Sequence, residues 1–265
     1  MDKKIPVGLS MYSIKEEILT DLEGTLAAVK SFGYDGFEFQ GKPIKEPKYI
    51  SRVLKDNGLD CISWHFPAYQ MFLGDDETFK RTADYLAELG IHYAIITVLP
   101  SEWYSSVKNL QEGAAMLTEY QERLRPYNIV LGAHNHWQEF NLDIPSGKTY
   151  WTLLREMTPP DFVQEFDPGN AARGNADLIG ELQMAADAGR AKLLHVKPYS
   201  LVNRFETILG NADDICDYKE MCQISKKAGT EYIFIEYQNK SMFFNNLDGV
   251  RVTVERFKRR YGQYL

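Results

Sequence analysis

Residues of the kinds that bind metal ions lie at the ends of several short apolar runs of this sequence. In chain order these ends are Ser63-Trp64-His65, the string from His134 to Glu139, Glu165-Phe166-Asp167, His195-Val196-Lys197 and Glu236. Taken singly, a histidine or carboxylate at such a place is more often a satisfied polar group or a helix cap. The prediction of a functional site therefore depends on these side chains coming together in space.

Carboxylates and imidazoles that converge with almost no Lys or Arg between them repel one another. They also cost much free energy to desolvate unless a cation lies among them. Mixed oxygen and nitrogen ligands suit one divalent metal ion, and Mn, Co, Mg and Zn are all compatible with this set. The residue types alone thus predict a mononuclear metal site.

The elements that would carry these residues follow a β/α rhythm, in which short runs rich in Val, Ile and aromatic residues alternate with longer segments of helical periodicity. The eight predicted strands are residues 6–11, 36–39, 61–65, 93–98, 129–134, 162–167, 192–197 and 232–236. Glycine marks five joints where a helix would end before a strand, at Gly33, Gly58, Gly90, Gly189 and Gly229.

The strand runs are nearly continuous in apolar character, as strands buried on both faces require. Eight such units favour a closed (β/α)8 TIM barrel of the α/β class over an open doubly wound sheet. No GxGxxG string follows the first strand, so a dinucleotide-binding fold is disfavoured. We predict one barrel domain over residues 1–265, with its site at the carboxyl ends of the strands.

Composition excludes several classes of partner. The formal charge of −7, with only a short basic string at Lys258-Arg259-Arg260, offers no surface suited to nucleic acid. No stretch of about 18 apolar residues predicts a membrane span. The three cysteines form no CxxC pair, and the N-terminus lacks a secretory pattern. A cytoplasmic location is expected.

Several strings of the sequence resemble the sugar phosphate isomerase/epimerase superfamily, the xylose isomerase-like barrels. They are Gly33 to Glu38, the HNHxxEF string from His134 to Phe140, the DxGN string from Asp167 to Asn170 and His195-Val196-Lys197. The likeness covers nearly the whole chain. A departure is Pro198, which stands where the family commonly has an aspartate.

In such enzymes Glu, Asp, His and Glu from strands five to eight hold one metal ion. The resemblance therefore implies Glu139, Asp167, His195 and Glu236 as ligands. Strand five leaves two candidates, because relatives ending that strand in Glu-Asn-His align their glutamate with His134. Glu139 is preferred because a carboxylate supplies the charge and basicity that the reaction needs.

The function implied is a divalent-metal-dependent isomerase or epimerase of a small sugar, keto-sugar or polyol, acting by proton transfer through a metal-stabilised enediolate. Such chemistry needs a base at the carbon and positive charge at the forming oxyanion. Glu139 and Glu236 would act as base and returning acid, with Lys197 as a catalytic group or a counter-ion. The expected substrate-binding residues are His65, His134, His136, Asn170 and Trp137. Glu38, at the end of the second strand, is a candidate hydrogen-bond partner of a metal ligand and would not itself bind the ion.

Three alternatives remain open at this stage. A lyase of the inosose dehydratase or keto-glycoside cleaving type would use the same site, and a non-catalytic sugar-binding barrel would keep the fold alone. A multi-metal nuclease is disfavoured by Asn170, by the strand end Val98-Leu99 and by the acidic composition. Dimers and tetramers are common among similar proteins, so a homo-oligomer is compatible with the resemblance.

Overall fold

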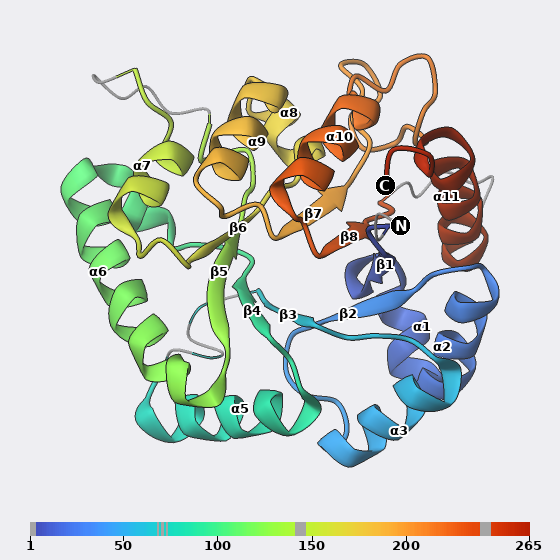
Figure 1. Cartoon of the computed structure of the whole chain (residues 1–265), viewed down its shortest axis with the longest axis horizontal. Helices are drawn as coiled ribbons and strands as arrows, with labels where there is room; N and C mark the ends of the chain where they lie inside the picture. The colour runs from blue at the N-terminus through green and yellow to red at the C-terminus, as the bar shows by residue number, and fades with distance from the viewer. Residues whose placement is uncertain (1–3, 68, 70–71, 73, 141–146, 239–244) are drawn as a thin grey trace.

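Eight parallel strands form the centre of the structure, a computed structural model that describes residues 4–67, 69, 72, 74–140, 147–238 and 245–265 (Figure 1). The strands are β1 Val7–Ser10, β2 Gly36–Gln40, β3 Ser63–Phe66, β4 Tyr93–Ile96, β5 Val130–His134, β6 Val163–Glu165, β7 Leu193–Val196 and β8 Tyr232–Ile235. The helices around them are α1 Lys15–Thr20, α2 Leu22–Ser31, α3 Pro47–Asn57, α5 Asp76–Leu89, α6 Val107–Leu124, α7 Tyr150–Met157, α8 Pro168–Arg173, α9 Leu178–Asp187, α10 Tyr218–Ala228 and α11 Asn246–Tyr261. Short 3-10 helices cover Met11–Ile14, Ser101–Ser105 and Arg125–Tyr127.

The strands follow one another around the ring in the order β6-β5-β4-β3-β2-β1-β8-β7, all in parallel. The remaining seam, between β6 and β7, is joined by a parallel bridge of Phe166 with Leu194, and the His195 N–H donates to the Phe166 carbonyl at 2.9 Å. The predicted α/β barrel of eight strands is therefore confirmed. All eight predicted strand regions contain a strand of the barrel.

The joints between helices and strands use left-handed backbone, as the sequence predicts. Gly33, Gly58, Gly90, Gly189 and Gly229 all have positive φ. The joint before β5 has no glycine, and there Asn128 takes the same conformation with φ 57°. Asparagine tolerates this region better than most residues, so it replaces glycine without a large cost.

The interior of the barrel is layered because alternate residues of each strand point inward. The lower layer is apolar and contains Tyr93, Ile95, Val163, Leu193, Tyr232 and Phe234. Gly8 makes room for it, since a Cβ at this position would lie 2.6 Å from the Phe234 ring. Above this layer β2, β3, β6 and β7 each contribute one buried titratable side chain, which are Glu38, His65, Glu165 and His195.

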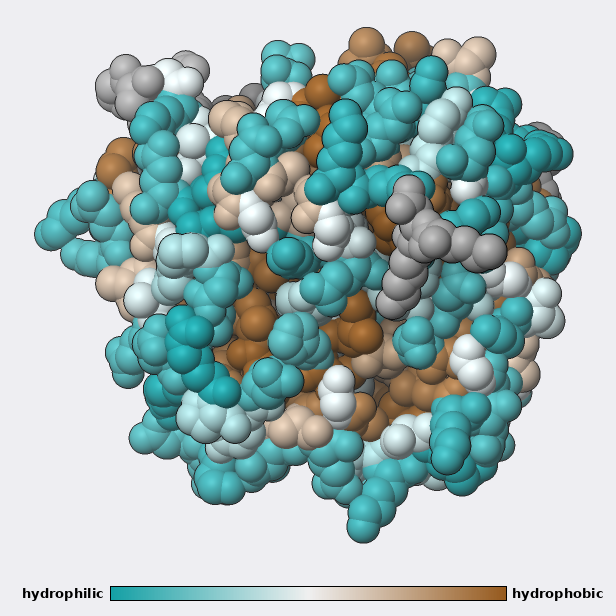
Figure 2. All heavy atoms as spheres, viewed as in Figure 1, coloured by the Kyte–Doolittle hydropathy of each residue, from teal (hydrophilic) through white to brown (hydrophobic). Residues whose placement is uncertain are grey.

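The outer face of the molecule is covered by the helices. In the view of Figure 2, which has the strands at its centre, hydrophilic residues cover most of the periphery, and hydrophobic residues are visible mainly nearer the middle. α11 packs against α2, and the Tyr34 hydroxyl at the start of β2 donates to the Val250 carbonyl at 2.8 Å. Among the described residues, no helix combines the length and apolar character that a membrane span requires.

Candidate metal centre

A cavity of about 290 Å³ opens at the carboxyl ends of the strands and is lined mainly by polar side chains. Its lining includes residues from every part of the ring: Ser10, Tyr12, Gln40, His65, Thr97, His134, His136, Asn170, Arg173, Lys197, Phe205, Glu236 and Gln238. Glu236 is the single carboxylate among these described lining residues. The cavity thus holds basic and neutral groups around one acid.

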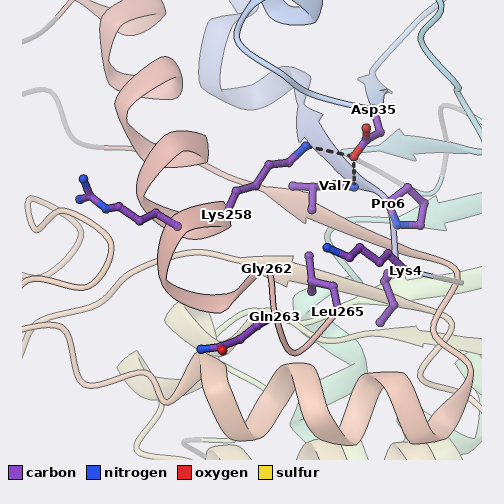
Figure 3. Close-up of a pocket in the computed structure, with 10 residues that line it drawn as sticks. Lys4, Pro6, Val7, Asp35, Lys258, Gly262, Gln263 and Leu265 are labelled. Carbon is purple, nitrogen blue, oxygen red and sulfur yellow. Dashed lines mark hydrogen bonds and ion pairs between the residues drawn. The ribbon is translucent and has the colours of Figure 1, made fainter. Parts of the chain in front are cut away.

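A larger cavity of about 650 Å³ lies beside the opposite ends of the strands, near Val7 (Figure 3). There Lys258 of α11 approaches Asp35 at 3.3 Å, and Asp35 accepts the Val7 N–H at 2.9 Å. These contacts attach α11 to the base of the barrel, and no histidine lines this cavity among the described residues. The strand-end cavity is therefore the candidate site.

Four buried side chains at the strand ends form an outer group: His134, Asp167, His195 and Glu236. One nitrogen or oxygen of each lies within 4.8 Å of the others. His134 Nε2 is 3.4 Å from Asp167 Oδ2, and His195 Nδ1 is 3.2 Å from Glu236 Oε2. These separations suit donor atoms that share one cation.

The hydrogen bonding of these side chains is also consistent with a divalent ion among them. Both ring nitrogens of His134 are buried and have no hydrogen-bond partner among the described residues. A buried polar atom is normally satisfied, and a metal ion beside His134 would satisfy one nitrogen. Two imidazoles and two carboxylates are a common ligand set for zinc, manganese or cobalt.

The ends of the strands hold these groups in place. Asp167 caps α8, since its Oδ1 accepts the Asn170 N–H at 2.8 Å. The Asn135 side chain binds the Asp167 backbone twice, accepting from its N–H at 2.8 Å and donating to its carbonyl at 2.9 Å. The other oxygen of Asp167, Oδ2, accepts the Asn170 side-chain amide at 3.2 Å and faces His134 in the outer group.

Lys197 neutralises part of this charge. Its Nζ is 2.7 Å from Glu236 Oε1 and 3.8 Å from Asp167 Oδ2, and it donates to Asn170 Oδ1 at 3.2 Å. Burial opposes the charged ammonium, but Glu236 and Asp167 outweigh it, so the pKa of Lys197 is raised. Burial likewise opposes the Glu236 carboxylate, yet Lys197 and His195 hold its pKa well below the usual range.

His136, at the cavity wall, is uncharged, unlike Lys197 and Glu236. Burial, assisted by Lys197, lowers its pKa to about 4, so its imidazole is neutral near pH 7. Its Nδ1 has no hydrogen-bond partner among the described residues. His136 can therefore accept a hydrogen bond or a proton from a bound molecule.

A second, inner group lies one layer deeper and consists of Glu38, His65, Glu165 and His195. His65 Nε2 donates to Glu165 Oε2 at 2.6 Å and lies 3.1 Å from Glu38 Oε1. Burial opposes protonation of His65, but the two glutamates raise its pKa to about 9. His195 belongs to both groups, because its two ring nitrogens face different layers.

Of the predicted metal ligands, the structure brings Asp167, His195 and Glu236 together and places Glu139 elsewhere. Glu139 Oε2 accepts the His136 N–H at 2.9 Å, and Oε1 accepts the Tyr104 hydroxyl. The chain turns after β5, so this carboxylate folds back on its own loop. His134, the other candidate at strand five, lies in the outer group with Asp167, His195 and Glu236.

Of the five predicted substrate-binding residues, four line the cavity and one does not. His65, His134, His136 and Asn170 line the cavity, whereas Trp137 lies outside its lining and packs under the Arg173 guanidinium at 5.1 Å. No role was predicted from the sequence for Glu165, Asn135 or Tyr12. Glu165 was detectable, since it lies two residues before Asp167 and must share its face of the strand.

Comparison with known proteins agrees with this architecture. A family model described as xylose isomerase-like TIM barrel matches residues 26–260. A search of curated protein sequences finds no significant match.

Solved structures of similar fold include a sugar phosphate isomerase/epimerase from Parabacteroides distasonis, with 21% identity, coverage of 97% of this chain and 95% of that chain, and a TM-score of 0.82. An L-ribulose 3-epimerase has 12% identity, coverage of 98% and 95%, and a TM-score of 0.74. The IOLI protein with a binding zinc atom has 12% identity, coverage of 98% and 99%, and a TM-score of 0.73. At these identities the likeness shows the fold.

Proposed function

Because this chain belongs to the xylose isomerase-like TIM barrel family, we propose that it is a divalent-metal-dependent isomerase or epimerase of a small sugar, keto-sugar or polyol. The observation that carries the proposal is the buried outer group of His134, Asp167, His195 and Glu236 beside a polar cavity. The names of the similar structures, which include an epimerase and a zinc-containing protein, support the same reading. The class of substrate is proposed together with the reaction.

The cavity favours a substrate of monosaccharide size. A volume of about 290 Å³ lies at the lower end of small-molecule sites, which span roughly 300–1,000 Å³. Its lining offers amides, imidazoles and one ammonium, which suit hydroxyl and carbonyl oxygens. Tyr12 and Phe205 add aromatic surface against which a sugar ring can pack.

In the proposed site His134, Asp167, His195 and Glu236 hold one divalent ion. When bound, the ion supplies positive charge and a template for neighbouring oxygen atoms of the substrate. Glu236 is the proposed base, because it is the cavity's carboxylate and a low pKa keeps it ionised. Lys197 Nζ, at 2.7 Å from Glu236 Oε1, orients this carboxylate and can donate to a developing oxyanion.

The second proton-exchanging group is proposed to be His136. We expected Glu139 to share the proton transfer with Glu236, but Glu139 is bound to its own loop and does not line the cavity. His136 lines the cavity as a neutral imidazole with a free nitrogen. For an inversion, Glu236 would take the proton from one face of the carbon, and His136, once it has taken up a proton from solvent, would return a proton to the other face.

One observation favours a lyase as the second candidate. Only one carboxylate lines the described part of the cavity, so the pair of carboxylates that would serve a symmetrical epimerisation is missing. A single base beside a leaving hydroxyl or glycosidic oxygen is enough for elimination. Loss of water or of an alcohol, seen in the product mass, would identify this reaction.

The Glu236→Gln variant tests the proposed reaction on a panel of keto-sugars, aldo-sugars and polyols. Removing the base should lower kcat at least 100-fold on the substrate that the wild type converts. Glu231→Gln, at the other end of β8, is the matched control and should keep wild-type turnover. Equal turnover in Glu236→Gln would reject the assigned role, and a wild type without any divalent ion would reject the proposed metal centre.

A further inference from the structure

His195 contacts both groups of the site through different atoms of its ring. Its Nδ1 faces Glu236 Oε2 at 3.2 Å in the outer group. Its Nε2 faces Glu38 Oε2 at 2.9 Å in the inner group. An imidazole that binds a cation through one nitrogen carries its proton on the other, and that proton needs an acceptor.

Glu38 is built to be this acceptor. Its side chain is completely buried, and its other oxygen, Oε1, accepts the Ser63 hydroxyl at 2.5 Å and lies 3.1 Å from His65 Nε2. The carboxylate therefore cannot rotate without losing three contacts. Glu165 also approaches His195 Nε2, but its Oε1 is farther away, at 3.5 Å.

The inner group is held together by hydrogen bonds and is not arranged to bind a second ion. His65 Nε2 is within hydrogen-bond distance of both Glu38 and Glu165, and its Nδ1 lies 3.2 Å from the Thr97 hydroxyl. A second ion that used His195 Nε2 would require both nitrogens of one ring to bind metal, and one that used His65 Nε2 would break the contacts of His65 with Glu38 and Glu165. One ion in the outer group leaves every contact of the inner group intact.

We propose that Glu38 is the positioning residue of the metal centre, which fixes the tautomer and ring orientation of His195 so that Nδ1 faces the ion. Ser63 and His65 hold Glu38 in turn. The inference rests on the proposed metal centre and adds to it the residue that determines its affinity. Carboxylates behind metal-binding histidines typically change metal affinity 10- to 100-fold when they are replaced.

Two measurements on the full-length protein test this inference. The first is the dissociation constant and stoichiometry of Co²⁺, measured by chelator competition for wild type, Glu38→Gln and Ser63→Ala. The second is the NMR spectrum of the Co²⁺-bound protein in water. There the paramagnetically shifted signal of the His195 Nε2 proton gives the rate at which this proton exchanges with solvent. Glu181→Gln is the matched control, since it removes a buried carboxylate of α9 that accepts hydrogen bonds from Thr149 at 2.9 Å and Thr152 at 3.3 Å instead of from a site residue.

We expect wild type and Glu181→Gln to bind one Co²⁺ with equal affinity. Glu38→Gln should bind one Co²⁺ about 10- to 100-fold more weakly, and its Nε2 proton should exchange faster. Ser63→Ala should weaken binding less and carries the test if Glu38→Gln fails to fold.

Unchanged affinity and exchange in both variants would overturn the inference while leaving the metal centre in place. Two Co²⁺ per wild-type chain, with one lost in Glu38→Gln, would overturn it in favour of a second metal site. A wild type that binds no Co²⁺ would overturn the proposed function as well.

Discussion

His134 and Glu139 are five residues apart in the sequence and have different environments in the structure. His134 is the last residue of β5, and its ring lies 4.7 Å from the His195 ring, centroid to centroid. Glu139 follows the turn after β5 and binds Tyr104 and the backbone of His136. The resemblance alone could not choose between them, because the choice depends on how the loop folds.

Replacing these two residues should therefore have very different effects on metal binding. His134→Ala removes one of the four proposed ligands and should weaken binding of Mn²⁺ or Co²⁺ by at least about 100-fold. This loss is larger than the one expected when a residue behind a ligand is replaced. Glu139→Gln removes no ligand and should leave the affinity within about threefold. Isothermal titration of both variants would check this, and a larger loss in Glu139→Gln would restore Glu139 as the ligand.

The remaining site residues differ in how readily the sequence revealed them. Asp167, His195 and Glu236 were predicted because they lie at or near the ends of strand runs and because the resemblance implies metal ligands at these positions. Asn135 was not named, since its role is to bind the backbone of a neighbouring strand at 2.8 and 2.9 Å. Nothing in a single sequence shows which amide will face which strand.

At the scale of elements, strand ends and helix starts determine where the site lies. β6 ends at Glu165, two residues before the predicted end, because Asp167 serves as the cap of α8. The same residue is thus part of the helix start and of the outer group. Local sequence patterns predict the strand and the helix, but their shared residue becomes clear only in the folded chain.

Gly229 tests how strongly one joint depends on glycine. It ends α10 with φ 71°, and a Cβ there would meet no atom within 4 Å, so the cost of a side chain is one of backbone conformation alone. Gly229→Ala should lower the free energy of unfolding by about 1–2 kcal/mol. Urea unfolding would measure it as a lower midpoint with an unchanged slope.

The exposed helical substitution Lys227→Ala is the control and should stay within about 0.5 kcal/mol of wild type. Metal affinity should be the same in both variants, because the joint lies at the opposite end of β8 from Glu236. A Gly229→Ala variant as stable as wild type would show that this joint relaxes to another conformation.

At the scale of the whole molecule, the proposed metal centre brings together residues from strands that are distant in sequence. The outer group joins β5, β7 and the residues that follow β6 and β8, so the ligands span residues 134 to 236. The barrel must be closed for these side chains to meet, since β6 and β7 flank the seam that joins the two ends of the sheet. A bound ion should therefore stabilise the closed fold.

Removal of the metal should lower the melting temperature. An ion present at 100 times its dissociation constant stabilises the native state by about 2.7 kcal/mol. For a chain of this size that corresponds to roughly 5–10 °C. Differential scanning fluorimetry with and without EDTA would measure the shift.

The His134→Ala variant should show little dependence on EDTA, which separates site binding from general salt effects. A wild-type melting temperature that is insensitive to both EDTA and added Mn²⁺ would contradict a bound ion in the native state.

The sequence by itself determined the class of fold and most of the residue types of the site. Hydrophobic periodicity, glycine at the joints and polar strand ends are local properties, and parallel strands around a barrel bring their carboxyl ends to one face. Only the tertiary structure showed that His134, and not Glu139, lies beside Asp167, His195 and Glu236. It also decided that Glu38, His65 and Glu165 form a layer beneath them. These outcomes depend on side-chain direction and on contacts between strands, which a linear pattern does not contain.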